Sequence, residues 1–385
     1  MKRCAFGFLC FALLLIGATT AHAGAKLKIN DDAEIDLAFR LQVLSIFSER
    51  DVDGGGDYES YDDFRIRRAR FRLTGTVNKH FGMFFQTDVS GNDIIMIDAY
   101  IHLKKDDGLQ AFVGQHLAPS SRQSITSSGA LMAMDRPGLT YKALTWGGRA
   151  LTTFDTVTYG DGNAGFSGPA QVRDTGITVF GHQDASDKLH YKYYLGVYDG
   201  LSAPGKDSER YTGRFQLNFG DSESSFYSTS TYLGGKDTLS FGVSYDTQSD
   251  VSGASTPTTD YSYLTLDVFA DKPLGDGAFT FEGSYHDLDL DGANARAEGD
   301  GFYAQLGYLL PGKKWQVWGL YETWSAEDPT GKGSYDMFRV GVSYFMAKHN
   351  ANFKLGYEGF NADAPIGSSV EDSIGSLVLG FYTTY

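Results

Sequence analysis

Cysteine is almost absent from this chain of 385 residues. Its two cysteines, Cys4 and Cys10, both lie in the first 23 residues, which have the features of an export signal. If that signal is removed, the remaining chain has no cysteine. It then cannot form a disulfide, bind zinc through thiolates, attach a c-type haem or use a thiol as a nucleophile.

Long apolar runs and positive charge are also scarce. No stretch after residue 24 has the 18 consecutive apolar residues of a membrane-spanning helix. The 33 basic residues are outnumbered by 48 acidic ones, and this balance argues against a nucleic-acid partner. Histidines are scattered, and neither G-x-S-x-G nor H-E-x-x-H occurs. We therefore expect no enzyme.

The N-terminus has the layout of a secretory signal. Lys2 and Arg3 precede an apolar run over 5–17, and Ala21-His22-Ala23 provides small residues for cleavage. The alternative is a membrane anchor, but the run is short against the roughly 20 residues that a span needs. We predict a cleaved signal peptide over 1–23 and a short periplasmic lead over 24–32.

Period-two alternation dominates the rest of the chain. In 187–199, apolar or aromatic residues such as Leu195 and Val197 alternate with His190 and Lys192. Similar segments of about 10 residues recur to the C-terminus, whereas strands of soluble proteins have a mode near 5–6 residues. Strands of about 9–11 residues with one apolar face suit a tilted crossing of a bilayer. The pattern predicts an all-β fold, a transmembrane antiparallel barrel of 16–18 strands over 33–385, in the outer membrane of a Gram-negative bacterium.

Aromatic residues gather near the predicted strand ends. The set is Tyr193, Tyr194, Tyr261, Tyr263, Trp315, Trp318, Tyr321 and Trp324. We interpret them as membrane-interface girdles, with ordinary cross-strand pairing as the alternative. The last residues alternate up to Tyr385, which resembles the C-terminal signal of the barrel assembly machinery, an expected partner.

One acidic loop matches a calcium-binding pattern. Asp287, Asp289, Asp291, Gly292 and Glu298 fit D-x-D-x-D-G-x5-E. Spaced carboxylates can surround a hard cation with oxygen atoms. The flanking segments are strand-like and do not resemble EF-hand helices, so a solvated acidic hairpin loop is the alternative. Calcium is thus a possible ligand, and we expect no other cofactor.

Residues 64–73 form a basic segment in an acidic chain. Arg68, Arg70 and Arg72 share one strand face. A lipid-facing arginine at the bilayer midplane costs about 2–4 kcal/mol, so this face must point into the lumen. Arg65 and Arg67 have the opposite phase and require a bulge or a place at the membrane edge.

Two interpretations of this arginine ladder remain open. Rings of arginine or lysine can select anions in a pore. Alternatively, the ladder is structural and pairs with lumenal carboxylates such as Asp88 or Asp98.

From residue 64 to about 140 the chain resembles a known family, the phosphate-selective porin O and P family. The matching motifs are Phe64 to Arg72, Gly75-Thr76, Phe84 to Asp88, Asp98 to Ile101, Val113-Gly114-Gln115, Pro119, Thr126-Ser127-Ser128 and Met134-Asp135-Arg136. The resemblance implies 16 strands, usually a homotrimer, and an inward-folded constriction segment, here about 118–146. Its basic residues are Arg122, Arg136 and Lys142. Gly129 stands where phosphate-selective members typically carry a basic residue.

We therefore expect a passive porin for small solutes, with anions such as phosphate favoured. The predicted pathway residues are Arg68, Arg70, Arg72, Arg122, Arg136 and Lys142. Two alternatives remain: a porin for amides, sugars or cations, and a scaffold barrel that sheathes a partner such as a cytochrome.

Overall fold

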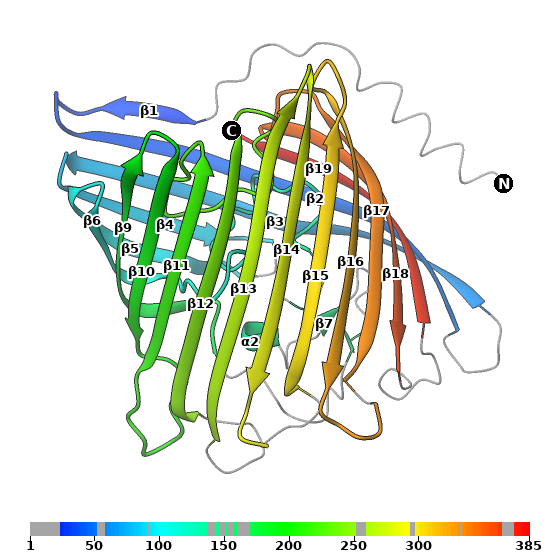
Figure 1. Ribbon diagram of the computed structural model, residues 1–385. Coiled ribbons are helices and arrows are strands. Elements are labelled where there is room, and N and C mark those ends of the chain that lie inside the picture. Colours follow the sequence, from blue (N-terminus) through cyan, green and yellow to red (C-terminus); the bar gives the residue numbers. More distant parts are fainter. Residues whose placement is uncertain are drawn as a thin grey trace.

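The computed structural model describes residues 24–51, 58–90, 93–137, 140, 143–146, 151–152, 158–159, 170–251, 259–292, 297–331, 333–363 and 373–385. In this part of the chain, 16 antiparallel strands close a barrel (Figure 1). The predicted fold class and strand number are confirmed.

The barrel strands follow one another around the wall. In chain order they are β2 (Glu34–Asp51), β3 (Tyr58–Asn78), β4 (Phe81–Asp88), β5 (Ile95–Asp106), β6 (Leu109–Leu117), β9 (Arg173–Ser186), β10 (Leu189–Tyr198), β11 (Arg210–Gly220), β12 (Thr238–Val251), β13 (Thr259–Leu274), β14 (Gly277–Asp289), β15 (Gly299–Leu309), β16 (Trp315–Ala326), β17 (Tyr335–Phe345), β18 (Ala351–Ala362) and β19 (Ser373–Thr384). Pairing of β19 with β2 closes the ring, and β6 pairs directly with β9.

Three smaller elements complete the description. Strand β1 (Ala25–Lys28) pairs with the first residues of β2. Strands β7 (Leu151–Thr152) and β8 (Thr158–Tyr159) form a separate ladder. Helix α2 (Ala143–Trp146) is one turn long. Among the described residues, no helix has the length and apolar character needed to cross a membrane.

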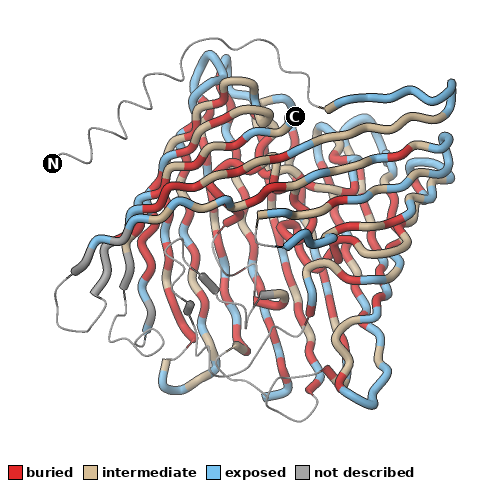
Figure 2. Tube along the Cα trace, turned by 180° about the vertical axis from the view of Figure 1, so that it is seen from behind, coloured by how far each residue is buried: buried red, intermediate tan, exposed pale blue. Residues whose placement is uncertain are grey.

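Burial alternates along the strands in the sense that a membrane barrel requires. On β10, Leu195 and Val197 are exposed on the outer face, whereas His190 and Lys192 are buried in the interior. Figure 2 shows exposed and buried positions alternating along the barrel wall. The outer face is apolar and suits contact with lipid, whereas the polar inner face lines the lumen.

The aromatic interpretation is only partly right. Trp315 and Tyr321 are 44% and 46% exposed on the outer face, as girdle residues should be. Five others are buried inside the barrel instead: Tyr194, Tyr261, Tyr263, Trp318 and Trp324. There they pack in apolar clusters, one of which includes Leu144 of α2 and another Met132 and Met134. The girdle prediction is wrong for these five residues. Segments of the polypeptide fold into the lumen, and these aromatic rings pack against them.

Gly114 of β6 has a backbone conformation that demands glycine. Its φ is +127°, and a Cβ there would lie 2.4 Å from the carbonyl oxygen of Ala99 on β5. We expect Gly114→Ala to lower the free energy of unfolding by about 1–3 kcal/mol or more, because it combines backbone strain with a clash.

Denaturant unfolding of the refolded barrel in detergent measures this effect. Gly213→Ala is the matched control, because a Cβ at Gly213 on β11 meets nothing within 4 Å. Equal unfolding midpoints for the two variants would contradict the assignment of strain to Gly114.

Candidate functional site

One segment starts at the end of the barrel that carries the long connections and crosses the lumen. Residues 118–137, which follow β6, are mostly buried and lie inside the barrel wall. Side chains of the wall donate hydrogen bonds to its carbonyl oxygens. Lys354 Nζ reaches Ala133 O at 2.8 Å, and Arg339 Nη1 reaches Arg136 O at 2.9 Å. These hydrogen bonds from strand side chains to the backbone carbonyls of the segment hold it in place at residues 133 and 136.

A second segment enters from the opposite end of the barrel. Residues 221–237 join β11 to β12 on the side where other connections are as short as 79–80 or 107–108. This segment folds inward and forms a parallel bridge from Ser228 to Thr126. Ser228 N donates to Ile125 O at 3.0 Å, and Ser230 N donates to Ala130 O at 3.1 Å. Two inward segments, 118–137 and 221–237, therefore meet inside the barrel.

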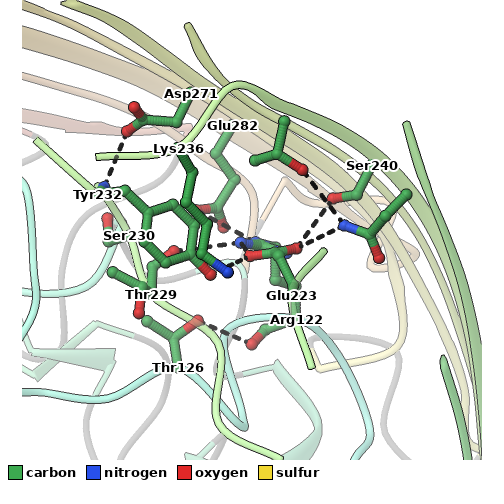
Figure 3. A network of polar contacts seen from close by, with 12 residues as sticks. Arg122, Thr126, Glu223, Thr229, Ser230, Tyr232, Lys236, Ser240, Asp271 and Glu282 are labelled. Atoms are coloured by element: carbon green, nitrogen blue, oxygen red, sulfur yellow. Dashed lines mark hydrogen bonds and ion pairs between the residues drawn. The ribbon is translucent and has the colours of Figure 1, made fainter. Parts of the chain in front are cut away.

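A buried ion pair fastens the two segments together (Figure 3). Arg122 of the first segment donates to both carboxylate oxygens of Glu223 in the second, at 2.9 and 2.8 Å. Glu282 of β14 lies 4.0 Å from Arg122 Nε, and the guanidinium carbon lies 3.7 Å from the ring centroid of Phe269. Burial opposes both charges. Even so, Glu223 raises the pKa of Arg122, and Arg122 holds the pKa of Glu223 well below its usual range. Arg122 therefore joins the segments and is closed off from solvent.

A β-bulge reconciles the two phases of the arginine ladder. Gln42 of β2 pairs with Arg68, and the next residue, Val43, pairs with Ile66, so Arg67 is the extra residue. The predicted bulge is confirmed. It lets Arg67 and Arg68 both reach Asp135 of the first segment, at 2.6 and 2.7 Å. Arg68 is thus a buried, paired residue.

The other two ladder residues are more open to the lumen. Arg70 Nε lies 2.7 Å from Asp88 Oδ2, which is the pairing expected of a structural ladder. Arg72 has no carboxylate within 4.0 Å among the described residues, and its Nε has no hydrogen-bond partner there. The ladder therefore contains a structural part and one guanidinium, that of Arg72, without a directly paired carboxylate. Asp36 of β2 acts on Arg72 electrostatically from a greater distance.

Arg40 on β2 is a second guanidinium beside the first inward segment, and it is buried. It stands opposite Arg70 in the strand register and donates to Ser128 Oγ at 2.7 Å. No described carboxylate lies within 4.0 Å of it. A Cβ at Gly129 would lie 2.3 Å from Arg40 Nη2. The guanidinium of Arg40 thus fills the space beside Gly129, the position at which the sequence departs from the basic residue that the resemblance implies.

The remaining predicted pathway residues lie elsewhere. Arg136 is buried and donates to carbonyl oxygens of its own segment, Thr126 O at 2.6 Å and Gln123 O at 3.2 Å. Lys142 lies outside the described residues. Arg70 and Arg72 are therefore partly exposed, whereas Arg68, Arg122 and Arg136 are buried in contacts with the segment 118–137 and its neighbours.

Two carboxylates of the acidic loop accept hydrogen bonds from backbone N–H groups of the same loop. Asp289 accepts a hydrogen bond from Asp291 N at 2.8 Å, and Glu298 accepts one from Gly292 N at 3.0 Å. The carboxylates of Asp287, Asp289, Asp291 and Glu298 do not bring three oxygen ligands within 4.8 Å of one another in this part of the chain. Calcium binding stays a prediction.

Sequence reasoning overlooked Arg40 and the segment 221–237. Arg40 has the lumenal phase of β2, since Phe39 on one side of it is exposed on the outer face. The argument used for the arginine ladder, that a charged residue on a strand of the barrel must face the lumen, would also have identified Arg40. The segment 221–237 could have been noticed from its length, because it stands where the barrel otherwise makes short turns.

Comparison with known proteins identifies the chain. A family model, phosphate-selective porin O and P, matches residues 46–361. An uncharacterized protein of Aquifex aeolicus (strain VF5) is 23% identical over 403 residues, which covers 94% of this chain and 88% of that protein. Two solved porin structures share the fold. The anion-selective porin from Comamonas acidovorans has a TM-score of 0.61 at 12% identity, covering 92% of this chain and 100% of that one. OmpT of Vibrio cholerae in its trimer form has a TM-score of 0.56 at 14% identity, with the same coverage. This chain therefore belongs to the phosphate-selective porin O and P family and is an outer-membrane porin.

Proposed function

We propose that this porin favours small anions such as phosphate. The observation that carries the proposal is the pair of guanidinium groups, Arg40 and Arg72, that lack a carboxylate partner beside the constriction. Lumenal arginines lower the electrostatic barrier for anions and raise it for cations. Two lumenal carboxylates beside the ladder, Asp88 and Asp135, are already paired with arginines, so they add little net negative charge there.

The mechanism is diffusion through water with weak, transient binding. A permeating anion must be attracted strongly enough to enter and held loosely enough to leave. Arg70 is partly neutralised by Asp88, so Arg72, which is partly exposed, provides the direct attraction. Arg40 is buried and contributes through its charge alone. The pathway requires no covalent step and no cofactor.

The proposal extends to assembly and export. We propose a homotrimer, as in the trimer form of the Vibrio cholerae porin with the same fold. Residues 1–23 would be removed as a signal peptide, and the C-terminal strand β19 would present Tyr385 to the barrel assembly machinery.

Single-channel recording in a planar bilayer tests the permeation proposal. Across a potassium chloride gradient, the reversal potential should show a preference for chloride, and added phosphate should reduce the chloride current by competing for the arginines. A preference for potassium would overturn the proposal in favour of a cation porin. A barrel that inserts without conducting would instead favour the scaffold function.

A further inference from the structure

Two histidines and an aspartate converge on the β9–β10 hairpin, beside the start of the second inward segment. His182 Nε2 lies 2.9 Å from Asp184 Oδ1, and His190 Nδ1 lies 2.5 Å from the same oxygen. His182 and Asp184 are two positions apart on β9, and His190 stands opposite Asp184 on β10. Within the described parts of the chain, this is the one set of His, Cys, Asp or Glu side chains with three ligand atoms inside 4.8 Å.

The surroundings of His190 orient its free nitrogen toward the aspartate. Its Nε2 lies 2.9 Å from Gly220 O, so Nε2 carries a hydrogen and donates it to that carbonyl. In a neutral imidazole, Nδ1 is then an acceptor that faces an acceptor oxygen of Asp184. Two acceptors at 2.5 Å require a positive charge between them, which is either a proton or a metal ion.

His182 provides the second nitrogen. Its Nε2 faces both Asp184 and the hydroxyl of Ser222, at 2.9 and 2.7 Å. Its Nδ1 is buried without a hydrogen-bond partner. Without an ion, Nε2 carries the hydrogen and donates it to the Asp184 carboxylate, since a carboxylate oxygen can only accept. When an ion binds, the hydrogen moves to Nδ1, which no other group occupies, and Nε2 becomes a ligand.

We propose that His182, Asp184 and His190 bind a divalent transition-metal ion of the zinc type. Imidazole nitrogens and a carboxylate are suitable donors for Zn²⁺, with a fourth position left for water or the Ser222 hydroxyl. Bonds of about 2.0–2.2 Å around a tetrahedral ion place the ligand atoms more than about 3 Å apart. Asp184 is 61% exposed and can retract by the small distance required.

The site would act on the second inward segment. Gly220 O and Ser222 Oγ, which contact the two histidines, belong to the residues where the chain leaves β11 and enters the segment 221–237. A bound ion would fasten the β9–β10 hairpin to the root of that segment. This inference does not depend on the anion preference, because it concerns the anchoring of the constriction and not the charge inside it.

Zinc titration of the untagged, full-length barrel in detergent tests the site. Isothermal calorimetry should show one zinc ion per chain, and Co²⁺ should give the visible absorption of a tetrahedral site. Asp184→Asn and His190→Gln should each weaken zinc binding by more than the roughly 10- to 100-fold that loss of an outer-shell partner costs.

His80→Gln is the matched control, because it removes an exposed histidine from the β3–β4 turn. Zinc affinity should be unchanged in this variant. Asp184→Asn alters an exposed side chain and keeps the barrel intact, so loss of binding in it cannot be attributed to misfolding. The proposal is wrong if the wild-type barrel takes up no zinc, or if Asp184→Asn and His190→Gln bind zinc as tightly as the wild type.

Discussion

Replacing Arg40 and Arg72 together with glutamine should abolish most of the anion preference of the channel. A unit charge beside a permeating ion in water contributes on the order of 1 kcal/mol at about 4 Å, or roughly fivefold in permeability for each charge. Both guanidinium groups lack a carboxylate within 4.0 Å among the described residues, so their charge is not cancelled locally. Glutamine keeps polarity and the capacity to bond Ser128, so the constriction should retain its shape.

The reversal potential across a potassium chloride gradient measures this change. A double variant of Lys79 and Lys105 to glutamine is the matched control, because it removes the same charge from exposed positions near the short turns. That control should leave the selectivity nearly unchanged. An Arg40 and Arg72 variant with wild-type reversal potential would show that the two arginines do not govern permeation.

The sequence predicted those features that depend on local periodicity. Arg68, Arg70 and Arg72 share a strand face because side chains alternate, and the cost of an arginine in lipid determines which face points inward. The phase conflict at Arg67 predicted either a bulge or a place at the membrane edge, and the register of β2 and β3 contains a bulge. Fold class, strand length and the inward face of the ladder follow from such nearest-neighbour arguments.

The contacts that define the constriction could not be predicted in this way. Arg122 and Glu223 are 101 positions apart, and nothing in either local pattern names the other. The aromatic residues show a related limit. Alternation predicts that Tyr263 and the residues next to it point to opposite faces of the strand. It does not predict which face Tyr263 takes, because an aromatic ring packs equally well against lipid and against other residues in the lumen. The choice depends on whether inward segments supply contacts, which is a property of the tertiary fold.

The role of Arg122 in that tertiary fold leads to the second large effect. Arg122→Leu should release the two inward segments from each other, because it leaves Glu223 and Glu282 buried without their cation. Breaking a buried ion pair from one side typically costs about 3–5 kcal/mol. The strand ladders of the barrel do not involve Arg122, so the loss should fall on the contact between 118–137 and 221–237.

We therefore expect a folded barrel with a larger and noisier single-channel conductance, and faster proteolysis within 221–237 than in the wild type. Replacing Glu223 by leucine as well should recover part of the loss, because the double variant removes the unpaired carboxylate together with its partner. Wild-type conductance and protease resistance in Arg122→Leu would mean that the backbone bridge between Thr126 and Ser228 suffices to hold the segments. Recovery in the double variant would instead show that the Arg122–Glu223 pair holds the two segments together. The backbone bridge between Thr126 and Ser228 is present in the wild type and in both variants, so it could not explain the difference.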